Sequence, residues 1–142
     1  MDKIKISMDQ LQDPEFKLPE IEAVPCYIGF QKCYECAEKI VKESMVIHDG
    51  YTVQSPYWYV NEYFHIFSYL SSYDLSEVDT SEGHVLFYDK IYQAGEDWKR
   101  ETFSKLNAYG SWNDISSICE SMQTAVCEAY NPIRVLAESI GK

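Results

Sequence analysis

The sequence predicts a mainly α-helical domain of five or six helices, preceded by a short N-terminal β-strand or extended arm. Apolar residues recur at helical spacing through most of residues 29–142. Residues 1–28 instead carry Pro14, Pro19 and Pro25, which lack a backbone donor and disfavour helix in the residue before them. At 142 residues the chain can bury a core without disulfides or metal. We therefore expect an extended arm, residues 1–28, and a helical domain, residues 29–142.

The arm starts with Ile4 and Ile6 alternating with lysines in "KIKIS", which is the pattern of a short strand. The later segment "FKLPEIEAVPCYIG" is expected to be extended, either as an edge strand or laid across a neighbour. That neighbour is this chain's own body or another subunit. Since an extended segment can add to a partner's sheet edge through backbone hydrogen bonds, we assign partner binding to Phe16, Leu18, Ile21, Val24 and Tyr27.

The helical spacing begins at Gly29 and predicts a first helix that ends near Ser44. Asp-Gly between the apolar runs "MVIH" and "YTVQ" then indicates a hairpin or loop. Ser55 and Pro56 suit the start of the next helix. That helix, "PYWYVNEYFHIFSYLSSY", is apolar on most sides, so it is central in the core or faces both a core and a partner. We assign partner binding to its aromatic residues Tyr57, Trp58, Tyr59 and Tyr63.

An acidic segment, "DLSEVDTSEG", is expected to form a loop. Its Glu77, Asp79 and Glu82 make either a patch for a basic partner or a solvated loop that supports the following helix through its dipole. Thr80 or Ser81 would cap that following helix.

Four further helices are expected towards the C-terminus. One ends at Ala94-Gly95, and "EDWKRETFSKLN" indicates a more polar one. A third begins near Ser111 and is expected to stop at Asn131-Pro132, before a last short helix "IRVLAESI". The apolar stripe of the helix that begins near Ser111 comprises Ile115, Ile118, Cys119, Met122, Val126 and Ala129.

Cys33 and Cys36 form a Cys-x-x-Cys pair, the only catalytic-looking motif in the chain. An extended segment followed by this pair and a helix is similar to thioredoxin, where a helix N-terminus makes the first thiol a nucleophile. Here the pair lies on an apolar helical stripe, and the chain that follows gives mostly helical patterns. A zinc site would add Cys26 and His48, in a spacing that matches no standard zinc pattern. We interpret Cys33 and Cys36, like Cys119 and Cys127, as structural residues.

The histidines give no catalytic signature. His65 lies between apolar neighbours, as an interior or interface histidine does, whereas His48 and His84 lie near predicted turns. The chain has neither a nucleophile-elbow serine nor a glycine-rich phosphate loop. We therefore predict no catalytic residue, no metal ligand, no cofactor and no small-molecule substrate, and a protein that is not an enzyme.

The net charge of −11 repels nucleic-acid phosphates and anionic membrane surfaces, so direct nucleic-acid binding is not expected. The sequence has no apolar run of about 18 residues. Its first residues, "MDKIKISMDQ", lack the apolar segment of a signal peptide, so neither membrane insertion nor secretion is expected. The 12 Tyr, 6 Phe and 3 Trp suit a protein interface, with a protein partner or self-assembly.

Three segments between about Cys33 and Ile140 resemble small proteins of tailed bacteriophages: "YFHIFSYLSSYDL", "LFYDKIYQAG" and "CEAYNPIRVLAESI". The resemblance implies a neck, connector or tail-assembly component, located in the bacterial host cytoplasm or the virion, and carries over no functional residue. Our first hypothesis is a non-enzymatic assembly subunit. The alternative is a small acidic inhibitor, an anti-defence protein that mimics the charge of DNA towards a host enzyme. A redox or zinc protein centred on the cysteine pair is a third.

The assembly hypothesis makes one prediction about the arm. If the arm is a separable element that contacts a partner, deleting residues 1–28 should leave a folded monomer that no longer assembles. An unfolded product would contradict a separable arm.

Overall fold

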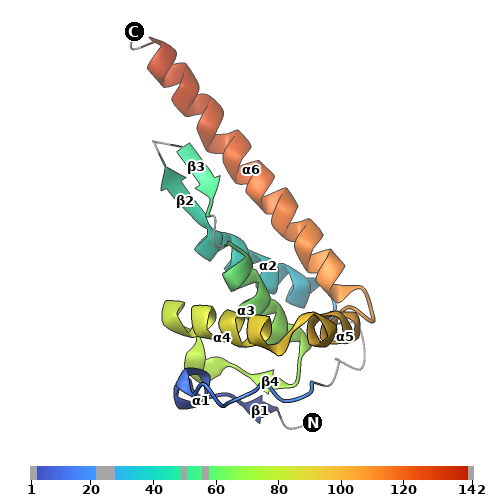
Figure 1. Ribbon diagram of the computed structural model, residues 1–142. Helices are drawn as coiled ribbons and strands as arrows, with labels where there is room; N and C mark the ends of the chain where they lie inside the picture. The colour runs from blue at the N-terminus through green and yellow to red at the C-terminus, as the bar shows by residue number, and fades with distance from the viewer. Residues whose placement is uncertain (1–2, 22–27, 49–50, 56–57, 141–142) are drawn as a thin grey trace.

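The computed structural model describes residues 3–21, 28–48, 51–55 and 58–140. Within them the chain is mainly helical, as the sequence predicts. The helices are α1 (Met8–Gln12), α2 (Phe30–Ser44), α3 (Trp58–Leu70), α4 (Ser81–Ala94), α5 (Glu96–Leu106) and α6 (Ser111–Ile140), with a 3₁₀ turn η1 (Ser76–Val78). Figure 1 shows α1 to α5 gathered in a body, with α6 crossing it and running on past its edge.

Two pairs of short strands complete the fold. β1 (Ile4–Lys5) pairs in parallel with β4 (Tyr73–Asp74), so that Ile4 lies opposite Tyr73. β2 (Met45–His48) and β3 (Tyr51–Gln54) form an antiparallel hairpin in which Met45 lies opposite Gln54. The predicted N-terminal strand and hairpin are both confirmed.

The start of α4 follows the predicted capping chemistry. Thr80 is the N-cap, and its hydroxyl oxygen accepts a hydrogen bond of 3.0 Å from the backbone of Gly83. Gly95 ends the helix with φ of 93°, which glycine adopts without a steric penalty. Helix α1 was not expected within the arm. It forms because Ser7 and Gln10 make a reciprocal capping box.

The N-terminal segment packs into the core of its own chain. Ile6, Leu11, Leu18 and Ile21 are at most 7% exposed, and Phe16 is partly buried against the same core. Three of the residues that the sequence assigned to a partner, Phe16, Leu18 and Ile21, thus contact the chain's own body. This is the intramolecular arrangement that the sequence left open. Val24 and Tyr27 lie outside the described residues.

Polar contacts also hold this segment against the helices. The ammonium of Lys90 on α4 donates to the backbone carbonyls of Asp13 and Phe16, at 2.6 and 2.9 Å. The hydroxyl of Tyr73 donates to the carbonyl of Pro19. These side chains give the backbone carbonyls of the segment hydrogen-bond donors from the body of the domain.

Helix α6 contradicts the predicted break at Asn131-Pro132, because it continues as one helix of 30 residues to Ile140. Proline removes a single backbone donor and crowds the preceding turn, which disfavours a helix locally. The cost is confined to that turn, and α6 continues on both sides of it. The expected separate terminal helix is therefore the last part of α6.

Glu62 on α3 is a buried carboxylate, 8% exposed, whose Oε1 accepts a hydrogen bond of 3.3 Å from Ser116 on α6. Burial raises its pKa, and the hydrogen bond from Ser116 acts in the opposite direction. A folded-state pKa above that of the unfolded chain means that the folded state retains this proton to higher pH. The contribution of Glu62 to stability is therefore greatest in acid and is lost as pH rises through the folded pKa.

We expect Glu62→Gln to raise the free energy of unfolding at pH 7, because the neutral amide avoids the cost of burying a charge and can still accept from Ser116. Its advantage over the unmodified chain should shrink as the pH is lowered towards 4. Urea unfolding of both proteins at several pH values measures this. Glu120→Gln, at an exposed site on α6, is the control and should change stability by less than about 0.5 kcal/mol. A less stable Glu62→Gln protein at pH 7 would contradict the prediction.

Candidate functional site

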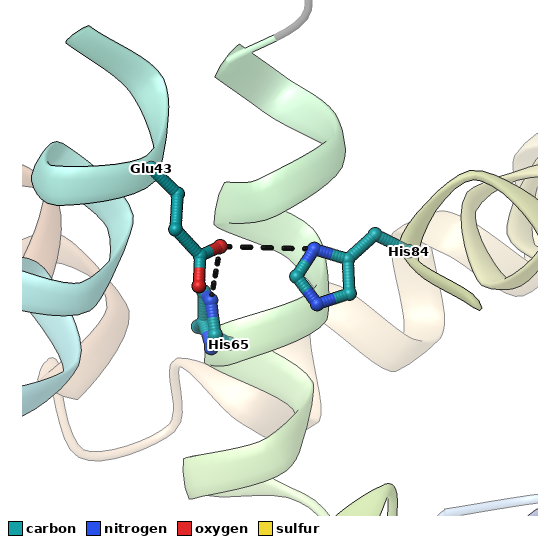
Figure 2. Close-up of side chains that lie close together, drawn as sticks. All are labelled: Glu43, His65 and His84. Carbon is teal, nitrogen blue, oxygen red and sulfur yellow. Dashed lines mark hydrogen bonds and ion pairs between the residues drawn. The ribbon is translucent and has the colours of Figure 1, made fainter. Parts of the chain in front are cut away.

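Three side chains from three helices converge at one point of the body. Figure 2 shows Glu43 from α2, His65 from α3 and His84 from α4 pointing towards one another. Glu43 Oε2 lies 2.8 Å from His65 Nε2 and 3.7 Å from His84 Nδ1. The three ligand-type atoms all lie within 4.8 Å of one another. The histidine side chains are 3% and 5% exposed, whereas that of Glu43 is 40% exposed.

The start of α4 is shaped so that His84 reaches this point. Thr80 caps the helix, and the turn η1 lies directly against its first turn. A Cβ atom on Gly83 would lie 1.9 Å from the carbonyl oxygen of Val78. Only glycine therefore permits η1 to lie this close. The same turn leads into Asp79, whose carboxylate reaches His84.

Both ring nitrogens of His84 face oxygen acceptors. Nε2 lies 2.7 Å from Asp79 Oδ1, and Nδ1 lies 2.9 Å from the amide oxygen of Asn61. The ring therefore lies between the carboxylates of Asp79 and Glu43, with the amide of Asn61 beside it. The ring of Phe64 stacks on His84 with centroids 3.9 Å apart, which fixes the plane of the imidazole.

His65 occupies a different environment from His84. Burial lowers its pKa, and the hydrogen bond and charge of Glu43 act in the opposite direction. Its Nε2–H donates to Glu43, and its ring stands nearly perpendicular to that of His84, at 84° and 5.2 Å between centroids. The site thus combines two buried imidazole rings and two carboxylates that reach solvent.

This cluster was only partly foreseeable from the sequence. His65 is interior, as predicted, and His84 lies near a turn, at the start of α4 after η1, but its burial was not foreseen. Glu43 and Asn61 carried no sequence signal, because Glu43 lies 22 residues and Asn61 lies 23 residues from the histidine that it contacts.

The predicted acidic patch is divided between separate partners. Asp79 pairs with His84, and Glu77 pairs with Lys5 of β1 at 2.9 Å. Glu82 is exposed in the first turn of α4. Two of the three carboxylates are therefore engaged by side chains of the same chain.

The aromatic residues assigned to partner binding on α3 also have partners in the chain. Tyr59 and Tyr63 both pack on Tyr88 of α4, with ring centroids 4.9 and 5.5 Å apart. Tyr63 also contacts the ring of Trp112. Trp58 is 36% exposed, and Tyr57 lies outside the described residues.

The cysteine pair is buried, as the structural interpretation requires. Cys33 and Cys36 are 0% exposed on α2. Burial raises the pKa of Cys36, and it raises the pKa of Cys119 to about 12, so neither thiol is activated as a nucleophile. The thiol of Cys119 lies 3.8 Å from the carbonyl oxygen of Ala37. Cys26 lies outside the described residues, as do the side chains of His48 and Cys127.

No protein-family model, curated protein or solved structure matches this chain. Among the residues that the structure describes, no helix combines the length and apolarity needed to cross a membrane. The proposals below rest on the geometry and spacing of this chain's own residues.

Proposed function

We propose that the protein is a non-enzymatic subunit that functions through protein–protein contacts, and that copies of the chain associate through α6. The observation that carries the proposal is the length of this helix. At 30 residues it extends for about 45 Å, at about 1.5 Å per residue. Figure 1 shows that it continues beyond α2 and beyond the β2–β3 hairpin. Because most helical stability in proteins comes from packing of an apolar face, a helix of this length favours a packing partner.

The apolar spacing of α6 supports a helical partner. Apolar residues alternate at intervals of four and three along the whole helix, as in the heptads of a coiled coil. In the first half, Ile115 is 0% and Cys119 is 6% exposed, because they face the body. The same spacing persists to the C-terminal end. The full series is Ile115, Cys119, Met122, Val126, Ala129, Ile133, Leu136 and Ile140.

Exposed aromatic residues on the neighbouring helix offer additional contact area. Phe30 and Tyr34 on α2 are 66% and 40% exposed, and their rings contact each other at 6.0 Å. Aromatic side chains of this kind are enriched in the centres of protein interfaces.

A neck, connector or tail-assembly subunit of a tailed bacteriophage is the particular form of this proposal that the sequence resemblance supports. The acidic-inhibitor alternative draws less support, because Glu77 and Asp79 are already paired within the chain. Salt separates the two: association through apolar residues persists at high salt, whereas binding through carboxylates weakens.

We expect the double variant Ile133→Lys with Leu136→Lys to lower the mass of the particle in solution to that of the monomer. Two charged side chains at positions of the apolar series would have to be buried at a helix–helix contact, which is costly. Sedimentation analysis measures the mass, and circular dichroism checks that the helix content is retained.

The matched control is Ser121→Lys with Thr124→Lys, which introduces the same charges, also three residues apart, at exposed positions of α6. It should leave the mass unchanged. If the variant Ile133→Lys with Leu136→Lys retained the mass of the unmodified oligomer, the proposed role of α6 would be contradicted.

A further inference from the structure

We propose that Glu43, His65 and His84 form a binding site for a divalent transition-metal ion, with Zn²⁺ as the ion that fits best. The site would supply two imidazole nitrogens and one carboxylate oxygen from three different helices. It goes beyond the association proposed for α6 and does not depend on it. Three protein ligands leave a further position for water or for an oxygen of this chain.

The distances suit coordination after a small adjustment of side chains. Zinc binds nitrogen and oxygen ligands at about 2.0–2.2 Å, so two ligands of a tetrahedral ion lie about 3.4 Å apart. Glu43 Oε2 is 2.8 Å from His65 Nε2 and 3.7 Å from His84 Nδ1, values that lie on either side of this separation. An ion between the three atoms would replace the hydrogen that Glu43 now accepts from His65 Nε2.

The surroundings of His84 support this assignment independently of the ligand distances. A metal-binding histidine commonly donates its second ring N–H to a carboxylate, which fixes the tautomer and orients the ring. Asp79 accepts from His84 Nε2 at 2.7 Å, leaving Nδ1 directed at Glu43. Asn61 Oδ1 lies 2.9 Å from that same Nδ1, so a neutral oxygen stands beside the three ligands.

Charge and access also favour a cation here. The histidine rings are buried, but Glu43 and Asp79 have side chains 40% and 48% exposed, so an ion can enter between carboxylates. Mixed imidazole and carboxylate ligands suit zinc, whereas calcium and magnesium prefer oxygen ligands alone. The ion would join α2, α3 and α4 at one point and stabilise the folded state by binding to it alone.

The test is titration of the chelator-treated full chain with ZnCl₂ in a calorimeter, with thermal unfolding in parallel. We expect one ion per chain and a rise in Tm of roughly 5–10 °C when free zinc is about 100-fold above the Kd. Glu43→Gln and His65→Gln should each abolish or strongly weaken binding. Asp79→Asn, a positioning residue, should weaken it about 10- to 100-fold. Glu82→Gln, at a nearby exposed carboxylate, should bind as the unmodified chain does.

Cobalt distinguishes this site from the buried cysteines and does not require a variant to fold. Co²⁺ bound by nitrogen and oxygen gives weak visible bands, whereas thiolate ligands add an intense near-ultraviolet charge-transfer band. We expect the first spectrum from the unmodified chain. A thiolate band, the absence of one-to-one zinc binding, or binding that Glu43→Gln and His65→Gln leave unchanged would each overturn the proposal.

Discussion

Removal of residues 1–21 is expected to leave a chain that no longer folds cooperatively. The segment places Ile6, Leu11, Leu18 and Ile21 in the core, each at most 7% exposed. Burying one such side chain contributes about 1.5–3 kcal/mol, so the four together are comparable to the about 5–15 kcal/mol that stabilises a typical domain. The truncated chain would also lose β1, the partner of β4. Loss of the near-ultraviolet circular dichroism and of a sigmoidal urea transition would report this outcome.

A conservative substitution tests the same packing without removing any backbone. Tyr73→Phe keeps the buried ring but removes the hydroxyl that donates to the carbonyl of Pro19. Loss of this partly buried hydrogen bond is expected to cost about 0.5–1.5 kcal/mol of unfolding free energy. Tyr109→Phe, at a residue that is 54% exposed, should have no measurable effect.

For the truncation, the contradicting result is a chain without residues 1–21 that still folds cooperatively. The arm would then be separable, as the sequence suggests.

Phe67→Ala is expected to lower the free energy of unfolding by about 3–5 kcal/mol. Phe67 is 0% exposed and lies at the centre of an aromatic cluster formed by several elements. Its ring centroid lies 5.3 Å from that of Phe87 on α4 and 6.4 Å from those of both Trp98 on α5 and Trp112 on α6. Truncation would therefore leave a cavity between four helices and remove the edge-to-face contact with Phe87.

Urea denaturation followed by tryptophan fluorescence measures this loss, because both neighbouring tryptophans report on the cavity. Tyr92→Ala is a suitable control, since the Tyr92 side chain is 69% exposed and its removal should change stability by less than about 0.5 kcal/mol. If Phe67→Ala cost no more than the control, the aromatic cluster would not be the centre of the core.

Periodicity and capping chemistry were sufficient to predict most of the fold. The helix from 30 to 44 and the hairpin follow from local patterns, and the cap at Thr80 and the end at Gly95 follow from the chemistry of those residues. Pro132 shows the limit of such rules, because α6 continues through a residue that disfavours a helix locally. The packing of residues 3–21 was undetermined for another reason. An apolar extended segment has the same sequence pattern whether it packs on its own chain or on a neighbouring subunit.

The candidate site was not predictable from spacing. Metal motifs are recognisable when ligands lie close in sequence, as in Cys-x-x-Cys, whereas the members of this cluster lie on three separate helices. Glu43, His65 and His84 meet only because α2, α3 and α4 pack together, and each has an ordinary local context. The cue within the sequence was Gly83, whose small size permits the turn before it, but its role is evident only once Val78 is located.

The mass of the unmodified protein in solution, measured by light scattering over a range of concentrations at low and high salt, tests the central proposal most directly. Association through the apolar spacing of α6 predicts an oligomer whose mass rises with concentration and persists at high salt, because burial of apolar surface is not screened by ions. A protein that remains a monomer of 16.5 kDa at every concentration and both salt levels would contradict self-association through α6.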